Sequence, residues 1–327
     1  MWGGNLFRRS ALILALTLLS ACATAPAPVP TAPQADDGRI IGPPAERGIY
    51  VWQAEIYQPG AYKLAGETDV WFSRHHCGGS LIAPDWVVTA AHCIPASATK
   101  PFQAIYKIRL GVYSLRDDEP WMIFDIDRPP IVHSGWRGSG GDGAYDVALI
   151  HLSRAPPLAM TRTHIGVITI PSGVDPGEAL EVTGWGRNTQ TARNQGRFRN
   201  YVSPGDMSMD LRTATLSLAA ATDCSTANHP ALPATHLCAR GQTRRGPDGA
   251  TLVQDACQGD SGGPLVQNLP GRGWRLVGVV SYGPPGKCGS AAGAYTDLTR
   301  PEIRRWICQS TGMPSCPAEW RGPAARP

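Results

Sequence analysis

Short apolar runs, each about the length of one strand, alternate with turn-forming residues along most of the chain. The clearest runs are Trp86–Ala90, Val147–Ile150, Val167–Ile170 and Leu276–Ser281, and clusters of Gly, Pro, Asp or Ser separate them. The chain contains 37 Gly and 30 Pro residues, which favours many turns over long helices. This pattern predicts an all-β barrel or sandwich and argues against alternating strands and helices.

One helix is predicted near the end of the chain. Thr299 and Glu302 have the spacing of a capping box, in which each side chain bonds the other residue's backbone N–H. Ile303, Trp306 and Ile307 then follow with helical spacing and form one apolar face. Gly312 ends the helix.

The N-terminus is typical of an export signal. Arg8 and Arg9 precede an apolar run, Ala11–Leu19, which is too short to span a bilayer as a mature helix. Leu19-Ser20-Ala21-Cys22 follows and resembles a bacterial lipobox, in which Cys22 is acylated and becomes the mature N-terminus. A plain signal peptide with an incidental cysteine is the alternative. Residues 22–39, rich in Ala, Pro and Thr, are then an extended tether and propeptide.

The cysteine count agrees with export and lipidation. There are nine cysteines, so eight remain if Cys22 is lipidated. An even set in an oxidising compartment predicts four disulfides. The spacing of these cysteines does not resemble a zinc motif.

Charge and composition exclude several classes of protein. The formal net charge of +4 is too small and too scattered to indicate a nucleic-acid-binding protein. The sequence has no phosphate-binding loop or zinc-protease motif, and we expect no cofactor and no metal. The acidic cluster at 117–119 is explained as well by a surface turn as by a calcium site. Residues 188–210 are polar and predict a long surface loop.

The segment Gly259-Asp260-Ser261-Gly262-Gly263-Pro264 has the composition of a nucleophile turn. A serine hydroxyl is a weak nucleophile until a base removes its proton, and the oxyanion formed by its attack on a carbonyl needs hydrogen-bond donors. Flanking glycines let the backbone bend and point N–H groups inward. We expect Gly259 and Ser261 to supply the oxyanion donors.

Two further segments supply partners for Ser261. They are Thr89-Ala90-Ala91-His92-Cys93 and Asp146-Val147-Ala148-Leu149. Together the three segments resemble the chymotrypsin-like (trypsin-type) serine proteases over roughly residues 39–310, in the family's chain order of His, Asp and Ser. The resemblance implies two six-stranded antiparallel β-barrels with the active site between them and a C-terminal helix. It assigns His92 as base, Asp146 as its orienting partner and Ser261 as nucleophile. Four nearby residues are weaker candidates for the base and its partner: His75, His76, His133 and Asp142.

The resemblance also implies a specificity. Asp255 matches the floor of the primary pocket in trypsin-type members, and Gly283 and Gly293 match the pocket-wall positions that must be small. Ser281 belongs to the same pocket. A buried acid left without a partner is costly, so we expect cleavage after Arg or Lys and rejection of uncharged residues.

Activation and disulfide pairing are implied in the same way. Arg39-Ile40-Ile41-Gly42 resembles the family's activation junction, where the freed Ile40 amine pairs with Asp260. Pro43-Pro44 departs from the usual glycine and makes the swing of a new N-terminus harder. The implied disulfides are Cys77–Cys93, Cys224–Cys238 and Cys257–Cys288, which leaves Cys308–Cys316.

We therefore expect a monomeric trypsin-like endopeptidase that acts on protein or peptide substrates and is made as a zymogen. It would be exported and held at a bacterial periplasmic or outer-membrane face by lipid on Cys22, then released by cleavage at Arg39. Two different hypotheses remain open: a catalytically silent homologue that serves as a binding module, and a fold kept as a zymogen by Pro43-Pro44. The expected divisions are 1–21 signal peptide, 22–39 tether, 40–172 first barrel, 173–299 second barrel and 300–327 helix and tail.

Overall fold

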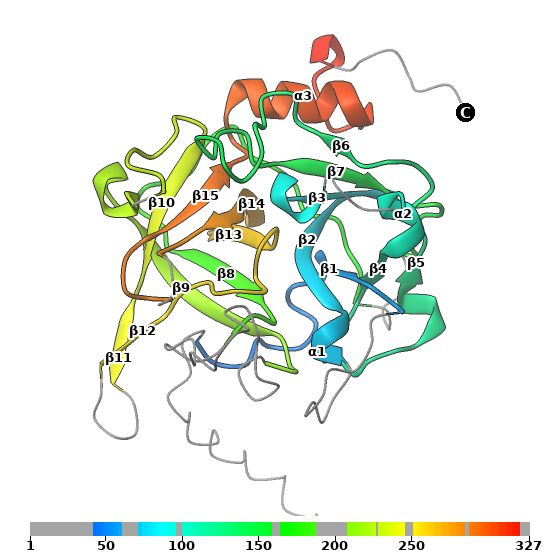
Figure 1. Cartoon of the computed structure of the whole chain (residues 1–327), viewed down its shortest axis with the longest axis horizontal. Helices are drawn as coiled ribbons and strands as arrows, with labels where there is room; N and C mark the ends of the chain where they lie inside the picture. The colour runs from blue at the N-terminus through cyan, green and yellow to red at the C-terminus, as the bar shows by residue number, and fades with distance from the viewer. Residues whose placement is uncertain are drawn as a thin grey trace, which may run out of the picture. The chain divides into compact units, whose positions relative to one another are not determined.

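Two antiparallel sheets carry most of the regular structure, as Figure 1 shows for the computed structural model of the chain. The residues described are 42–60, 71–95, 100–158, 164–187, 208–226, 228–245, 251–284 and 288–320. The predicted leader, tether and activation junction, with Cys22, Arg39 and Ile40, lie outside them, as does most of the predicted 188–210 loop.

The first sheet has seven strands in the order β5-β4-β1-β2-β3-β7-β6. Every residue of β3 and nearly every residue of β7 is buried, because the curled sheet encloses one face and is covered on the other. The strands are β1 (Gln53–Tyr57), β2 (His75–Ala83), β3 (Trp86–Thr89), β4 (Lys107–Leu110), β5 (Ile123–Phe124), β6 (Ile131–Val132) and β7 (Ala148–His151).

The second sheet is a closed barrel in the order β10-β15-β14-β13-β8-β9. Apolar side chains such as Leu180, Leu265 and Tyr295 fill its interior. Its strands are β8 (Leu180–Gly184), β9 (Arg212–Leu218), β10 (His236–Gly241), β13 (Pro264–Leu269), β14 (Gly273–Tyr282) and β15 (Gly293–Asp297), and a separate hairpin pairs β11 (Thr243–Arg245) with β12 (Thr251–Val253).

The predicted all-β class is confirmed, with one difference in detail. The second barrel has six strands and is closed, whereas the first sheet has seven and, among the described residues, no ladder joins its end strands β5 and β6. Both end strands are only two residues long, which is too short to complete a closing ladder. The predicted strand at Val167–Ile170 is wrong: this segment forms only an isolated bridge, Thr169 to Arg275, although Ile168 is buried.

Helical segments are short apart from the last one. They are α1 (Trp71–Arg74), α2 (Phe102–Ile105) and α3 (Pro301–Thr311), with the 3-10 turns η1 (Ala91–Cys93), η2 (Pro120–Met122), η3 (Ala221–Cys224) and η4 (Ala318–Trp320). In the described part of the chain no helix is long and apolar enough to cross a membrane.

The C-terminal helix α3 packs its apolar face onto the first sheet's core. Ile303 and Ile307 are buried there, and Trp306 meets His133 edge-on at 4.8 Å between ring centroids. Figure 1 shows α3 beside β6 and β7. Gly312 ends the helix in the left-handed conformation, as predicted.

The predicted capping box at the start of α3 is wrong. Arg300 occupies the N-cap position, but its side chain makes no capping hydrogen bond to the helix. Pro301 is the first helical residue. The Thr299 hydroxyl instead donates to Asp297 Oδ1 at 2.6 Å. Because this aspartate at the end of β15 is buried beside it, the threonine bonds backwards and leaves the helix uncapped by side chains.

Four disulfides link neighbouring segments within the two halves of the molecule and in the tail. Sulfur–sulfur bonds join Cys77 to Cys93, Cys224 to Cys238, Cys257 to Cys288 and Cys308 to Cys316. The first fixes the turn that carries His92, the third lies beside the Ser261 turn, and the fourth fastens the tail to α3.

Candidate active site

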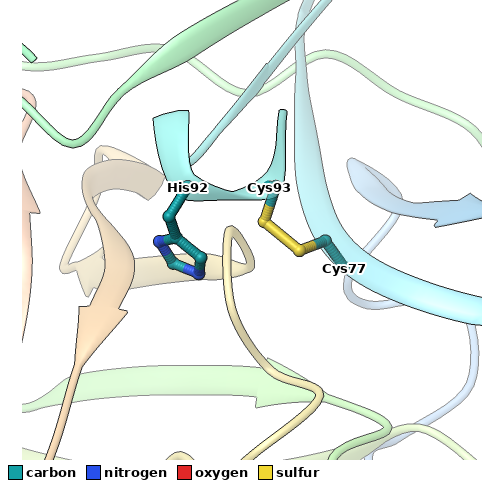
Figure 2. A group of neighbouring side chains, drawn as sticks. All are labelled: Cys77, His92 and Cys93. Atoms are coloured by element: carbon teal, nitrogen blue, oxygen red, sulfur yellow. A yellow bond between two sulfur atoms is a disulfide. The ribbon is translucent and has the colours of Figure 1, made fainter. Parts of the chain in front are cut away.

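His92 lies on η1, directly after the buried strand β3. Its backbone N–H donates to Asp146 Oδ1 at 2.9 Å, and its ring Nδ1 bonds Oδ2 of the same carboxylate at 2.7 Å. Figure 2 shows the His92 ring and the Cys77–Cys93 disulfide extending from this turn. Because Nδ1 is held by an acceptor, it carries the ring proton and Nε2 is left as the basic nitrogen.

The two cysteines next to His92 do not form a metal site with it. Ligand atoms of Cys77, His92 and Cys93 lie within 4.8 Å of one another, which is close enough to hold an ion. Both sulfurs, however, are bonded to each other. A disulfide supplies no thiolate, which is the form of cysteine that binds metals.

Asp146 is buried at the start of β7, with 1% of its surface exposed. Burial alone would raise the pKa of this carboxyl, but the bonds and charge of His92 and a bond from Ser281 outweigh it, and the pKa is lowered. Ser281 Oγ donates to Asp146 Oδ2 at 2.6 Å. The carboxylate is thus ionised and fixed from both sheets.

Ser261 lies in a tight turn before β13. Gly259 and Gly262 on either side have φ of 100° and 76°, values that side chains disfavour, so the turn requires glycine at both positions. Gly78 of β2 donates its N–H to the Ser261 carbonyl at 2.8 Å, which docks the turn onto the first sheet. Within the described residues, the N–H groups of Gly259 and Ser261 donate no hydrogen bond.

Asp260 is buried directly behind the serine. Its carboxylate accepts backbone N–H bonds from Gly186 and Cys257, each at 2.8 Å. Burial raises the pKa of Asp260 to about 7, although both bonds oppose this rise. A carboxyl with a pKa near 7 is only partly ionised at neutral pH. A nearby cation would favour its ionised form, because an opposite charge favours ionisation.

Asp255 and Ser261 both line a cavity of about 220 Å³. The carboxylate accepts N–H bonds from Ala256 and Gly289 at 2.8 Å each, and burial raises its pKa to about 7. Gly283 and Gly293 line the same cavity. A Cβ on Gly293 would lie 3.5 Å from Asp255 Oδ1 and narrow the approach to the acid.

His75, a weaker candidate for the base, has a different setting. Its Nδ1 bonds Glu55 Oε1 at 3.0 Å and its Nε2 bonds the Gly259 carbonyl at 2.8 Å. Both nitrogens face acceptors, so the ring carries two protons. Burial opposes this charge, but the bond and charge of Glu55 prevail and the pKa of His75 is raised.

The charges around His75 are features that the sequence did not reveal. Glu55 on β1 is fully buried and also accepts a bond from Arg109 Nε of β4 at 2.6 Å. Arg109 is itself fully buried and bonds the carbonyls of Leu115 and Asp117. The signal that the sequence offered for this cluster was the charged residues Glu55 and Arg109, each beside apolar residues in a short strand.

The fold does not bring three of the weaker candidates to the turn of Ser261: His76, His133 and Asp142. His76 bonds the Cys93 carbonyl and burial lowers its pKa, while His133 stacks on Tyr145 at 4.4 Å. Asp142 accepts the Ala144 N–H. Among the predicted candidates, His92 and Asp146 are the histidine and aspartate that bond each other.

The acidic cluster at 117–119 has the bonding of a surface turn. Asp117 Oδ2 accepts the N–H groups of Tyr113 and Ser114 at 3.0 Å and 2.8 Å. This carboxylate is therefore used by the backbone of its own loop.

A closed β-barrel joined to a second curled sheet, with a glycine-flanked serine and an aspartate-bound histidine where they meet, is the arrangement of a chymotrypsin-like serine hydrolase. The family model described as "Trypsin" matches residues 40–307, and the chain belongs to this family.

Individual relatives agree with this membership. The chain is similar to vitamin K-dependent protein C of Rattus norvegicus, with 34% identity over 280 residues that cover 82% of this chain and 51% of the relative. It is also similar to clotting factor C of Tachypleus tridentatus, with 31% identity over 285 residues that cover 82% of this chain and 25% of the relative. The chain thus spans about half and a quarter of the lengths of these proteins.

A solved structure supports the fold. Neuropsin, a serine protease expressed in the limbic system of mouse brain, matches with a TM-score of 0.58 and 25% identity. The match covers 84% of this chain and 98% of the neuropsin chain.

Proposed function

We propose that this protein is a serine endopeptidase that cleaves after Arg or Lys through an acyl-enzyme. The observation that carries the proposal is that Ser261 and the buried acid Asp255 line one cavity. His92, bonded to Asp146 through both its backbone and its ring, supplies the base for the same serine.

The reaction runs in two halves. Ser261 Oγ attacks the carbonyl carbon of the scissile bond while His92 Nε2 takes the hydroxyl proton. The tetrahedral intermediate collapses, the amine leaves with that proton, and an ester to Ser261 remains. Water, deprotonated by the same nitrogen, then attacks the ester; the bond to Ser261 Oγ breaks, the acid product leaves, and His92 returns the proton to Oγ. Asp146 keeps the proton on Nδ1 and stabilises the imidazolium without accepting that proton.

The developing oxyanion is met by the N–H groups of Gly259 and Ser261. In the described residues neither group has another acceptor, which supports this role. The loss of one such donor typically costs about 3 kcal/mol of transition-state stabilisation.

Specificity follows from Asp255. Two of the roughly four acceptor positions of an ionised carboxylate are taken by Ala256 and Gly289, which leaves capacity for a substrate cation. A guanidinium or ammonium in the cavity stabilises the ionised acid, whereas an uncharged side chain leaves it unpaired. The absence of side chains at Gly283 and Gly293 keeps the cavity open to a long residue.

The enzyme is made as a zymogen and is activated by cleavage at Arg39. The new Ile40 ammonium pairs with Asp260, whose burial raises its pKa to about 7 although the charge of His75 opposes this rise. The residues after the junction dock on the second barrel. Pro43 O accepts the Thr213 N–H, Gly42 O accepts a bond from Arg212 Nε, and Pro43-Pro44 therefore lies against β9.

Before activation the protein is a lipid-anchored, monomeric component of a bacterial cell envelope, held through Cys22. No cysteine lies between Cys22 and Arg39, so the same cleavage releases the enzyme. N-terminal sequencing of membrane and soluble fractions tests this. Active enzyme that stays on the membrane with Ile40 as its N-terminus would refute release.

The activity itself is tested with a small Arg amide. We expect hydrolysis by the processed protein, inhibition by benzamidine, and loss of hydrolysis in Ser261→Ala. Hydrolysis that survives in Ser261→Ala would disprove the assignment of the nucleophile. No hydrolysis by the processed wild type would favour either the silent binding module or the fold kept as a zymogen by Pro43-Pro44.

A further inference from the structure

A buried histidine outside the predicted site, His236, lies behind Asp146. It is the first residue of β10, pairs with Thr296 of β15 in the barrel, and has 5% of its surface exposed. Its Nε2 lies 3.2 Å from Ser281 Oγ and 3.3 Å from Thr296 Oγ1, and its Nδ1 lies 3.1 Å from Thr235 Oγ1.

The two hydroxyls near Nε2 both donate their hydrogen bonds to Asp146. Ser281 Oγ donates to Asp146 Oδ2 at 2.6 Å, and Thr296 Oγ1 donates to the Asp146 carbonyl at 2.8 Å. A hydroxyl has only one proton, so each oxygen can only accept from His236. The imidazole must therefore carry a proton on Nε2.

On the opposite side of the ring, Nδ1 faces a hydroxyl that is able to donate to it. Thr235 Oγ1 accepts the Tyr145 N–H at 3.2 Å, which leaves its own proton for His236 Nδ1. When Nδ1 accepts this hydrogen bond, the ring is neutral. Burial agrees with this, since it lowers the pKa of His236 to about 4 against the opposing charge of Asp146. Two further titratable groups act on the ring: His229, which also lowers the pKa, and Asp142, which raises it.

The hydrogen bonds of His236 thus lead to both ends of the dipeptide Tyr145-Asp146. On one side the Nε2 proton fixes Ser281 Oγ, whose own proton points to the Asp146 carboxylate. On the other side Nδ1 fixes Thr235, which holds the Tyr145 N–H. Tyr145 has φ of 56°, a conformation that costs energy for a residue with a side chain and persists only where neighbours hold it.

We propose that His236 is a positioning residue of the catalytic site, whose neutral Nε2–H imidazole sets the orientation of Asp146 through Ser281, Thr296 and Thr235. It touches neither substrate nor the reacting atoms. It acts on the rate by keeping the Asp146 carboxylate in line with His92 Nδ1. This inference rests on the proposed peptidase function.

The first test compares His236→Met with His236→Gln in the full, processed chain. Methionine fills the space but has no N–H, while the glutamine amide can donate to Ser281. We expect kcat for a small Arg amide to fall about threefold to tenfold in His236→Met, the rate equivalent of one hydrogen bond, with KM almost unchanged. His236→Gln should recover most of kcat.

A control variant separates this effect from the general loss of a histidine. His151 bonds Asp127 and Asp85 instead of the triad, so His151→Gln should keep wild-type kcat. The proposal is overturned if His236→Met keeps full kcat, or if the two His236 variants lose kcat equally.

A second measurement does not need activity. Long-range proton–nitrogen NMR of the wild type labelled with ¹⁵N-histidine distinguishes the two neutral tautomers and the imidazolium. The chain has 8 histidines, and the Thr235→Val and His236→Gln variants assign the signal. We expect a neutral ring with its proton on Nε2 at neutral pH. A proton on Nδ1, or a doubly protonated ring, would overturn the proposal even if the peptidase function itself had failed.

Discussion

Gly186 donates its backbone N–H to Asp260 Oδ1 at 2.8 Å, and a Cβ at this glycine would clash with the carboxylate. Gly184, two residues earlier at the end of β8, faces the same carboxylate just as closely. The glycines of Gly184-Trp185-Gly186 therefore let a strand end approach Asp260. The acid that precedes the nucleophile is held by backbone groups that only glycine permits.

Gly186→Ala should destabilise the fold by about 1–3 kcal/mol, the usual cost of adding atoms to a filled interior, and should lower activity by displacing Asp260. Denaturant unfolding and Arg-amide hydrolysis measure the two effects. Gly173→Ala is the matched control, since a Cβ there meets nothing within 4 Å. Equal stability in both variants would contradict the role of the close approach.

His75 should stabilise the folded state at low pH and lose that effect as pH rises. The folded-state pKa of His75 is raised above the unfolded value of about 6.5, so its stabilisation is complete below about pH 6.5 and is lost as pH passes the folded pKa. Urea unfolding between about pH 5.5 and 9 should show the wild type and His75→Gln converging as pH rises.

The neighbouring His76 provides a control of opposite sign. Burial lowers its folded-state pKa, so protonation favours unfolding and its contribution is lost as pH falls through the unfolded value. The difference between wild type and His76→Gln should therefore shrink towards low pH. Two variants with the same pH slope would show that the assignment of the two rings is wrong.

Benzamidine should bind more tightly as pH rises through about 7, the pKa of Asp255. Below that pH the free carboxyl is protonated, and binding of the cation must displace the proton. Calorimetry in buffers of different ionisation enthalpy should detect proton release at low pH. Asp255→Asn should weaken Kd by at least about thirtyfold, the usual cost of removing one partner of a buried charge pair.

A neutral ligand of similar shape is the control for Asp255. Benzyl alcohol has the ring but no amidinium, so its weak binding should not strengthen as pH rises. A benzamidine Kd that stays constant with pH, or that Asp255→Asn leaves unchanged, would remove Asp255 from the specificity pocket.

The disulfide between Cys308 and Cys316 should contribute stability but not catalysis. It closes a loop with a sequence separation of 8, for which loop entropy predicts about 2.5 kcal/mol. A Cys308→Ala, Cys316→Ala double variant should unfold at lower denaturant concentration and keep its kcat per folded molecule. Loss of kcat without loss of stability would place the tail in the catalytic site.

Local sequence determined the parts of this protein that depend on local backbone geometry. The Ser261 turn needs glycines at positive φ, and the turn of His92 adjoins the cysteine that anchors it, so both were recognisable from a few consecutive residues. The strand lengths and the Gly312 helix stop follow from equally local preferences. The predicted capping box is wrong because the Thr299 hydroxyl bonds Asp297 instead, and in Val167–Ile170 only Ile168 is buried and no strand ladder forms.

The tertiary structure decided the electrostatics around these motifs. Ser281 and Asp146 are 135 positions apart, and Glu55 and Arg109 are 54 apart, so the bonds between them exist only after the sheets have formed. Burial and partner geometry also set the charge on His75 and His236. The sequence shows a histidine at positions 75, 92 and 236 and nothing of their charge. Only the fold makes His75 a cation, leaves Nε2 of His92 free, and holds His236 neutral behind Asp146.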